Sequence, residues 1–178
     1  MDQKKPNTLK LAACAVVAAA YAALTVALAP ISYGAVQFRI SEALTILPFF
    51  IPCTLWGLTV GCILANLFTG NLFDVLFGSL ATLLAGLLTA RFGRKGNTVK
   101  NRLLACLMPV VFNALIVGAV ITWAYEGQSI LEHPGLFAVN AAWVGLGEAG
   151  VLYLIGYTLM KQLPKLKFFR EFADKCNQ

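Results

Sequence analysis

The sequence has few of the residue types on which soluble enzymes depend. Only 12% of its 178 residues are charged, and His133 is the single histidine. One histidine excludes a histidine cluster for a metal ion and the HExxH motif of zinc proteases. The GxxxxGK[ST] phosphate-binding loop is absent too, so this chain does not by itself hydrolyse ATP through such a loop. No serine nucleophile with a base is evident, and we expect neither an enzyme nor a cofactor or metal.

Paired cysteines are missing as well. The five cysteines, which form no paired spacing, are Cys14, Cys53, Cys62, Cys106 and Cys176. The first four lie within apolar runs, where thiols pack as small hydrophobic groups, so we assign the cysteines no chemistry. The net charge of +6 does not indicate nucleic-acid binding, because the basic residues stand at the ends of apolar runs.

Apolar residues, by contrast, are in excess. Hydrophobic residues make up 59% of the chain, more than in a soluble domain of this size. The long apolar runs cover residues 11–29, 40–68, 72–90, 103–125 and 135–160. Each is at or near the roughly 20 residues that cross a bilayer as a helix, the form that satisfies the backbone in lipid. The sequence therefore predicts an all-α, multi-pass protein of the cell membrane, with residues 1–178 in one domain.

The first run also resembles a secretory signal peptide, with lysines before it and ALAP at residues 27–30. Its apolar core of about 19 residues is longer than the roughly 7 to 15 of a signal peptide. We therefore interpret residues 11–29 as the first membrane span.

The basic residues fall into three clusters. These are Lys4, Lys5 and Lys10; Arg91, Arg94, Lys95, Lys100 and Arg102; and Lys161, Lys165, Lys167, Arg170 and Lys175. Short positively charged loops stay in the cytoplasm, so all three clusters belong on one side of the membrane. An even number of crossings must then separate the first two clusters, whereas only three apolar runs lie between them.

One run must therefore cross twice, and residues 40–68 are the candidate. Pro48 and Pro52 in the sequence LPFFIP each remove a backbone donor, which favours a hairpin between two short helices. Each short helix would be about 24 Å long, a little under the roughly 30 Å hydrocarbon core. The prediction is a bundle of six transmembrane helices with both termini cytoplasmic. Their ranges are about 11–29, 35–50, 53–68, 72–90, 103–125 and 135–160.

The C-terminal tail, residues 164–175, places Leu166, Phe169 and Phe172 at helical spacing with charged residues between them. This pattern fits a short amphipathic helix on the inner membrane surface. An ordinary solvated tail is the alternative.

Four ionisable residues lie within the predicted spans or at their edges: Arg39, Glu42, Asp74 and Glu148. Each costs roughly 2.5 to 3.5 kcal/mol at a helix centre, so such residues normally face a partner, a cavity or a ligand. Arg39 and Glu42 are either a mutual ion pair at i, i+3 or the lining of an outward-facing pocket. Asp74 is either a helix N-terminal residue favoured by the helix dipole or a ligand contact. Glu148 has no neutralising neighbour in sequence, which makes it a candidate ligand contact.

Amide and aromatic side chains extend the set of candidate binding residues to Asn71, Asn113, Asn140 and Trp143. The amides supply donors and acceptors, and Trp143 supplies a flat apolar surface. An aromatic side chain in a membrane helix more often packs internally or anchors at the interface.

Small residues form two further patterns. Ala15, Ala19 and Ala23 recur every four residues in the first span, and Gly57 and Gly61 form a GxxxG motif in the third. Such stripes let helix backbones approach closely, usually within one protein and less often between proteins.

Two stretches carry a resemblance to a known family. Residues 33–48, YGAVQFRISEALTILP, and residues 71–86, NLFDVLFGSLATLLAG, resemble the QueT family, and the likeness covers nearly the whole chain. The FRISEAL block is fairly specific to that family, whereas the six-helix pattern is not. QueT proteins are substrate-binding subunits, called S components, of energy-coupling factor (ECF) transporters, and they are linked to precursors of the tRNA base queuosine.

The resemblance implies high-affinity uptake of a 7-deazaguanine, such as preQ0 or preQ1, through a pocket near the outer face. A carboxylate can accept both N–H donors of a guanine-like edge while an aromatic ring stacks on the base. Glu42 and Glu148, the latter with Asn140 and Trp143, are equal candidates for this carboxylate, and Arg39 would hold the outer end of the second helix.

The resemblance also implies partners. An S component docks through an AxxxA-type face of its first helix, which Ala15, Ala19 and Ala23 match here. The partner is a membrane coupling subunit driven by two cytoplasmic ATPases, in keeping with the missing phosphate-binding loop.

Two other functions remain open on the sequence alone. The chain could be a stand-alone proton-coupled transporter of a small solute, with Glu148 or Glu42 as the proton site. It could also be a scaffold or regulatory membrane protein without a small ligand.

Overall fold

The computed structural model describes residues 6–33 and 37–178. Within these residues the regular structure is helical throughout and contains no strand, which confirms the predicted all-α class. Lys4, Lys5 and the predicted start of the second helix at residues 35–36 lie outside the described residues.

The helices follow one another along the chain with short connections. In the first half they are α1 (Pro6–Ala27), α2 (Ala29–Ser32), η1 (Ile40–Phe49), α3 (Thr54–Leu67), η2 (Asp74–Gly78) and α4 (Ser79–Arg94). In the second half they are α5 (Val99–Val120), η3 (Ile121–Tyr125), α6 (Pro134–Gly150), η4 (Val151–Gly156), α7 (Tyr157–Gln162), η5 (Leu163–Lys165) and α8 (Lys167–Asn177).

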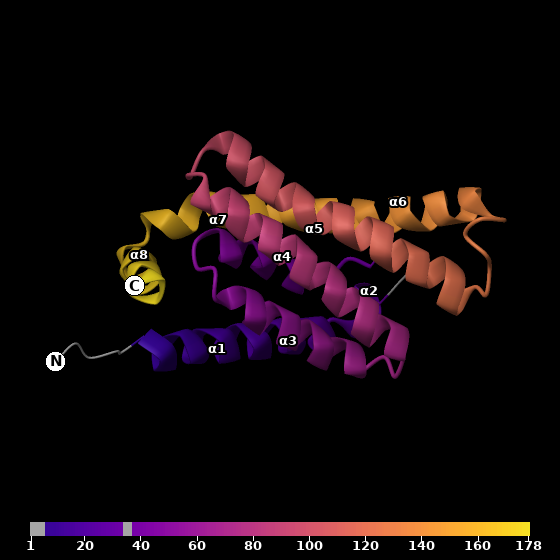
Figure 1. Ribbon diagram of the computed structural model, residues 1–178, viewed down its shortest axis with the longest axis horizontal. Coiled ribbons are helices and arrows are strands. Elements are labelled where there is room, and N and C mark those ends of the chain that lie inside the picture. The colour runs from indigo at the N-terminus through magenta and orange to yellow at the C-terminus, as the bar shows by residue number, and fades with distance from the viewer. Residues whose placement is uncertain (1–5, 34–36) are drawn as a thin grey trace.

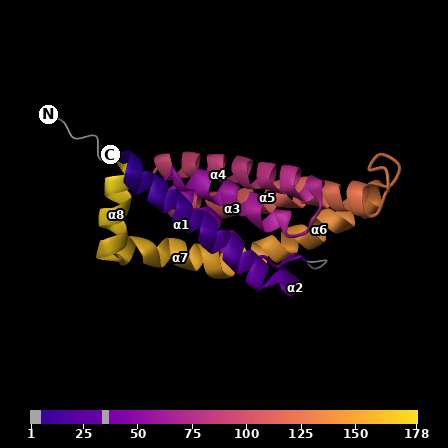
Figure 2. The ribbon, with the colours of Figure 1, turned by 90° about the horizontal axis from the view of Figure 1, so that it is seen from below.

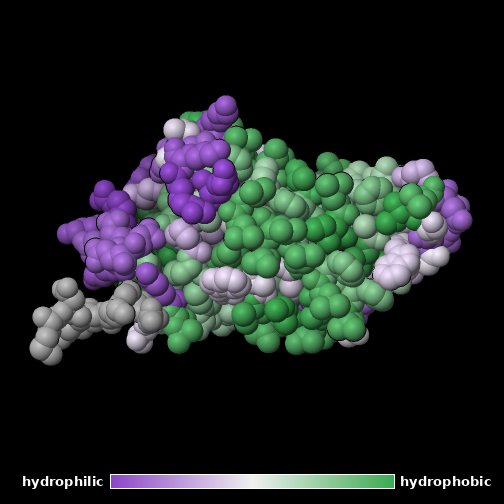
Figure 3. All heavy atoms as spheres, viewed as in Figure 1, coloured by the Kyte–Doolittle hydropathy of each residue, from purple (hydrophilic) through white to green (hydrophobic). Residues whose placement is uncertain are grey.

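Within the described ranges, four continuous helical segments are long and apolar enough to cross a membrane: Thr8–Ala27, Asp74–Arg94, Val99–Tyr125 and Pro134–Lys165. Ile40–Phe49 and Thr54–Leu67 are shorter apolar helices. Hydrophobic residues cover the middle of the molecule, and hydrophilic residues gather at its two ends (Figure 3). The chain is a multi-pass membrane protein.

The second predicted helix differs from the expectation. It is a 3-10 helix that begins at Ile40, not an α-helix over residues 35–50. Pro48 lacks the N–H that an α-helix needs there, and the Thr45 hydroxyl donates to the Glu42 carbonyl three residues earlier (2.6 Å). Ten residues at about 2.0 Å each span about 20 Å, even less than expected.

The predicted hairpin after Pro48 is present. Residues 50–53 connect η1 to α3, whose range of Thr54–Leu67 agrees closely with the predicted 53–68. Gly93 of α4 packs against the Phe49 carbonyl at this turn, so the hairpin end leaves no room for a side chain there.

The GxxxG motif of α3 packs within the molecule. Gly57 lies against the backbone of Cys14 on α1, and a Cβ added at Gly61 would stand 2.8 Å from the Ala18 carbonyl oxygen. The two helices lie side by side in Figure 1. Glycine permits this close approach because it has no side chain to separate the backbones.

The tail forms α8, which lies across one end of the bundle (Figure 2). Its buried residues Ala173 and Cys176 pack with Ala13 and Ile51, and the Asn177 amide donates to the Phe50 carbonyl (2.9 Å). The tail is therefore helical and packs against the bundle, and its position on the inner membrane surface stays a prediction.

The end of the molecule that carries α8 also carries the start of α1 and the α4–α5 connection (Figure 1). We call it the basic end, because Lys10, residues 91–102 and the α8 lysines gather there. The α5–α6 connection lies at the opposite end.

Candidate ligand-binding site

A group of buried polar residues lies inside this apolar bundle. Its members come from four segments and are Tyr21 on α1, Arg39 and Glu42 at the start of η1, Asn113 on α5 and Glu148 on α6. Glu42 is fully buried, and Glu148 is 2% exposed. Buried charges are costly in an apolar protein, so such a group normally serves a ligand or a partner.

Glu42 has one occupied and one free carboxylate oxygen. The Tyr21 hydroxyl donates a hydrogen bond to Oε1, whereas the buried Oε2 has no hydrogen-bond partner among the described residues. Tyr21 is fully buried, and its carbonyl accepts a hydrogen bond from the Thr25 hydroxyl (2.8 Å). Thr25 also hydrogen-bonds Ser41 (2.6 Å), which ties α1 to η1 beside Glu42.

Glu148 repeats this arrangement. The Asn113 amide donates to its Oε1 (2.9 Å), and its buried Oε2 again finds no partner in residues 6–33 and 37–178. Asn113 also lies near Glu42. The pair therefore presents two unpartnered acceptor oxygens inside the bundle, and we call Glu42 and Glu148 the carboxylate pair.

Arg39 does not neutralise Glu42 directly. Among the described residues no ion pair joins these side chains within 4.0 Å, so the interpretation as a mutual ion pair is wrong. The Arg39 Nε donates to the Ser32 carbonyl (3.2 Å), and the guanidinium lies 5.4 Å from the centre of the Tyr33 ring. Arg39 thus supports the carboxylate pair through its charge and holds the chain before η1.

The opposite end of the bundle has an open cavity of about 510 Å³. Its lining residues, which come from the connection before η1 and the ends of α3 and η3, are Tyr33, Gln37, Phe68, Thr69, Ile121, Tyr125 and Glu126. Tyr33 links this cavity to the buried group, because its ring contacts Arg39. The Tyr33 hydroxyl is held by the Ala65 carbonyl (2.6 Å).

Asp74 and Asn140 lie near this open cavity and outside the buried group. Asp74 accepts a hydrogen bond from the Tyr125 hydroxyl, and Tyr125 lines the cavity. The Asn140 amide donates to Glu126 (2.9 Å) and to Thr122 (3.0 Å), so it does not contact Glu148.

Two other candidates have different surroundings. The Asn71 side chain accepts from the Phe73 N–H (2.9 Å), a local contact at the turn before η2. Trp143 is 49% exposed, so it lies on the surface of the bundle rather than beside Glu148. The structure therefore brings together Arg39, Glu42, Asn113 and Glu148, but not Asn71, Asp74, Asn140 and Trp143.

The sequence interpretation missed Tyr21, Thr25 and Ser41, which position Glu42. Tyr21 and Thr25 are polar side chains one helical turn apart in an otherwise alanine-rich run. That spacing was the available signal, because residues at i and i+4 share one face of a helix. The sequence interpretation also missed Gln37 and Glu126, which line the open cavity. Both lie in connections between helices, where helical spacing gives no signal.

The chain is similar to known proteins over most of its length. Residues 11–165 match the family model described as QueT transporter. Among curated proteins, the chain is 34% identical over 170 residues to the queuosine precursor transporter QueT of Lactococcus lactis subsp. cremoris (strain MG1363). That match covers 91% of this chain and 96% of the relative. No solved structure matches the chain.

Proposed function

The chain belongs to the QueT transporter family, and from this membership and the buried site we propose that it is the membrane-embedded binding subunit for uptake of a queuosine precursor. Its ligand is a 7-deazaguanine such as preQ0 or preQ1, bound with high affinity. The L. lactis relative is a queuosine precursor transporter, which supports the substrate class.

The carboxylate pair carries this proposal. Glu42 and Glu148 each keep one buried oxygen without a hydrogen-bond partner, and such an oxygen is expensive to leave unpaired. The edge of a guanine-like base offers two adjacent N–H donors, which one carboxylate can accept together. An adenine-like edge lacks that pair of donors and would leave the carboxylate unsatisfied, so the same geometry provides specificity.

The path of the chain supports six membrane crossings with both termini in the cytoplasm. The crossings are α1, η1, α3, η2 with α4, α5 with η3, and α6 through α7. The basic residues gather at one end of the molecule, which the positive-inside rule places in the cytoplasm (Figure 1). The open cavity lined by Tyr33 and Tyr125 then faces the exterior. The shortness of η1 and α3 is absorbed by the longer helices around them.

Energy for transport comes from partners. The proposed partners are a membrane coupling subunit and two ATPases of an ECF module, because this chain has no phosphate-binding loop. Ala15, Ala19 and Ala23 are all exposed along α1, which makes them available to a helix of the coupling subunit.

Calorimetry on the purified chain tests the proposed ligand. Glu42→Gln or Glu148→Gln is expected to weaken binding of preQ0 or preQ1 at least tenfold, about 1.4 kcal/mol, without unfolding the protein. Glu171→Gln on α8 is the matched control, because its side chain is 57% exposed and far from the site in sequence. Normal binding by both site variants would contradict the assignment.

A stand-alone proton-coupled transporter is the second candidate function. Two neighbouring buried carboxylates can share a proton, which is the observation in its favour. Uptake that persists without the ATPases and collapses with the proton gradient would select it over the ECF mechanism.

A further inference from the structure

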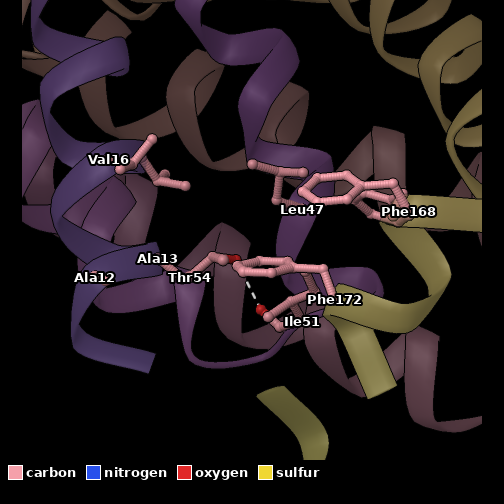
Figure 4. Close-up of a pocket in the computed structure, with 10 residues that line it drawn as sticks. Ala12, Ala13, Val16, Leu47, Ile51, Thr54, Phe168 and Phe172 are labelled. Carbon is pink, nitrogen blue, oxygen red and sulfur yellow. Dashed lines mark hydrogen bonds between the residues drawn. The ribbon is translucent and has the colours of Figure 1, made fainter. Parts of the chain in front are cut away.

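A separate apolar feature lies at the basic end, away from the carboxylate pair. It is a groove of about 380 Å³ between α1, the η1–α3 hairpin and α8. Figure 4 shows α1 on one side and the α8 phenylalanines on the other. Residues that line the groove include Ala12, Val16, Leu47, Ile51, Phe168 and Phe172.

The groove offers no free polar group to an occupant. Thr54 is the one lining residue with a polar side chain, and its hydroxyl already donates to the Ile51 carbonyl (2.7 Å; Figure 4). A polar ligand would therefore lose its hydrogen bonds with water and gain none in return. The occupant is apolar where it enters the groove.

The groove is an open trough and not an enclosed cavity. A hydrocarbon chain is narrower than a helix, which is about 10 Å across, and can follow such a trough along its length.

The edge of the groove is basic. By helical spacing, Lys175 lies two turns from Phe168 and on the same side of α8. Lys175 takes part in no ion pair within the part of the chain that the structure describes, and Lys167 makes only a 3.8 Å contact with Glu171 between exposed side chains. Exposed lysines at the cytoplasmic edge of a membrane protein attract anionic lipid headgroups.

We propose that this groove holds one acyl chain of an anionic phospholipid, with the phosphate group beside Lys175. The lipid would fix α8 against α1 and the hairpin. This site is independent of the ligand assigned to the carboxylate pair, so either can fail without the other.

Native mass spectrometry of the purified chain tests the proposal. The chain is taken from micelles with equal amounts of phosphatidylglycerol and phosphatidylcholine of the same acyl chains. One phosphatidylglycerol per chain is expected to remain bound, at least threefold over phosphatidylcholine. The variant Lys175→Gln should lose this preference, and Arg94→Gln/Lys100→Gln in the α4–α5 connection should keep it.

A groove-filling variant separates the acyl chain from the headgroup. Ala12→Phe places a ring in the groove and should abolish lipid retention, whereas Leu146→Phe on the exposed face of α6 should not. Equal retention of the two lipids, loss of preference in the Arg94/Lys100 control or full retention by Ala12→Phe would overturn the proposal. So would a lipid-free dimer, since a second copy would then occupy the groove.

Photocrosslinking locates the chain directly. Phosphatidylglycerol with a photoactivatable acyl chain should label peptides that contain residues 11–17 and 168–172. Labelling spread evenly over α4, α5 and α6 would mean that only the general lipid surface is detected, and would refute a specific groove site.

Discussion

At the scale of single residues, Arg39 lies in extended conformation before η1 begins, with φ −89° and ψ 98°. The i, i+3 spacing of Arg39 and Glu42, for which a mutual ion pair was one of two interpretations, therefore does not bring the two charges together. The spacing rule applies only to residues inside a helix. Tyr21 binds Glu42 instead, from a helix 21 residues earlier in the chain, and no local pattern indicates such a contact.

Tyr21→Phe tests the role of this hydroxyl. The substitution keeps the ring and removes the donor, so Glu42 would have neither oxygen paired in the empty protein. We expect a loss of about 1–3 kcal/mol in the free energy of unfolding. Thermal unfolding in detergent measures the change, with Tyr153→Phe as control because that hydroxyl makes a longer, exposed bond (3.3 Å). Equal stability of the two variants would show that the Tyr21 contact is unimportant.

At the scale of helices, the sequence predicted the segments well where composition decides. The hairpin after Pro48, the range of α3 and the tail helix were all predictable from proline, hydrophobic runs and helical spacing. The 3-10 form of η1 was not, because it depends on the Thr45 hydroxyl and on packing against other helices. Length alone cannot distinguish these helix types.

Gly57→Ala tests the close contact between α1 and α3. A Cβ at this position would overlap the Cys14 backbone, which cannot move aside without separating the helices. Overpacking of this kind costs about 1–3 kcal/mol, and thermal unfolding should show it. Gly135→Ala is the control, since no atom lies within 4 Å of its added Cβ. A neutral effect at Gly57 would mean that the two helices are free to separate.

Ala19→Trp tests the exposed face of α1. The bulky ring should block the coupling subunit, so uptake and complex formation are lost while ligand binding by the isolated chain is kept. Co-purification and calorimetry on the same preparation measure both effects. Leu146→Trp on α6 serves as a control with similar exposure to lipid. If Ala19→Trp abolishes ligand binding instead, the alanine face packs inside the protein.

At the scale of the whole molecule, two features underlie the proposed function. The bundle buries two half-satisfied carboxylates at the meeting point of α1, η1, α5 and α6, and it has an open cavity at the end opposite the basic residues. The sequence predicted the membrane class, the family and the four ionisable residues within the predicted spans or at their edges. It could not predict which candidates meet, because Asn113 and Glu148 are 35 residues apart and come together only when α5 packs on α6.

The most direct measurement removes one N–H donor from the ligand. Calorimetry compares preQ1 with its analogue lacking the 2-amino group, on the natural chain and on Glu42→Gln and Glu148→Gln. The natural chain should bind preQ1 at least tenfold more tightly than the analogue, which corresponds to about 1.4 kcal/mol. The variant at the carboxylate that accepts the 2-amino group should lose that difference. The account is contradicted if the natural chain binds preQ1 and the analogue equally, or if both variants keep the full difference in affinity. In either case no buried carboxylate accepts the 2-amino group of the base.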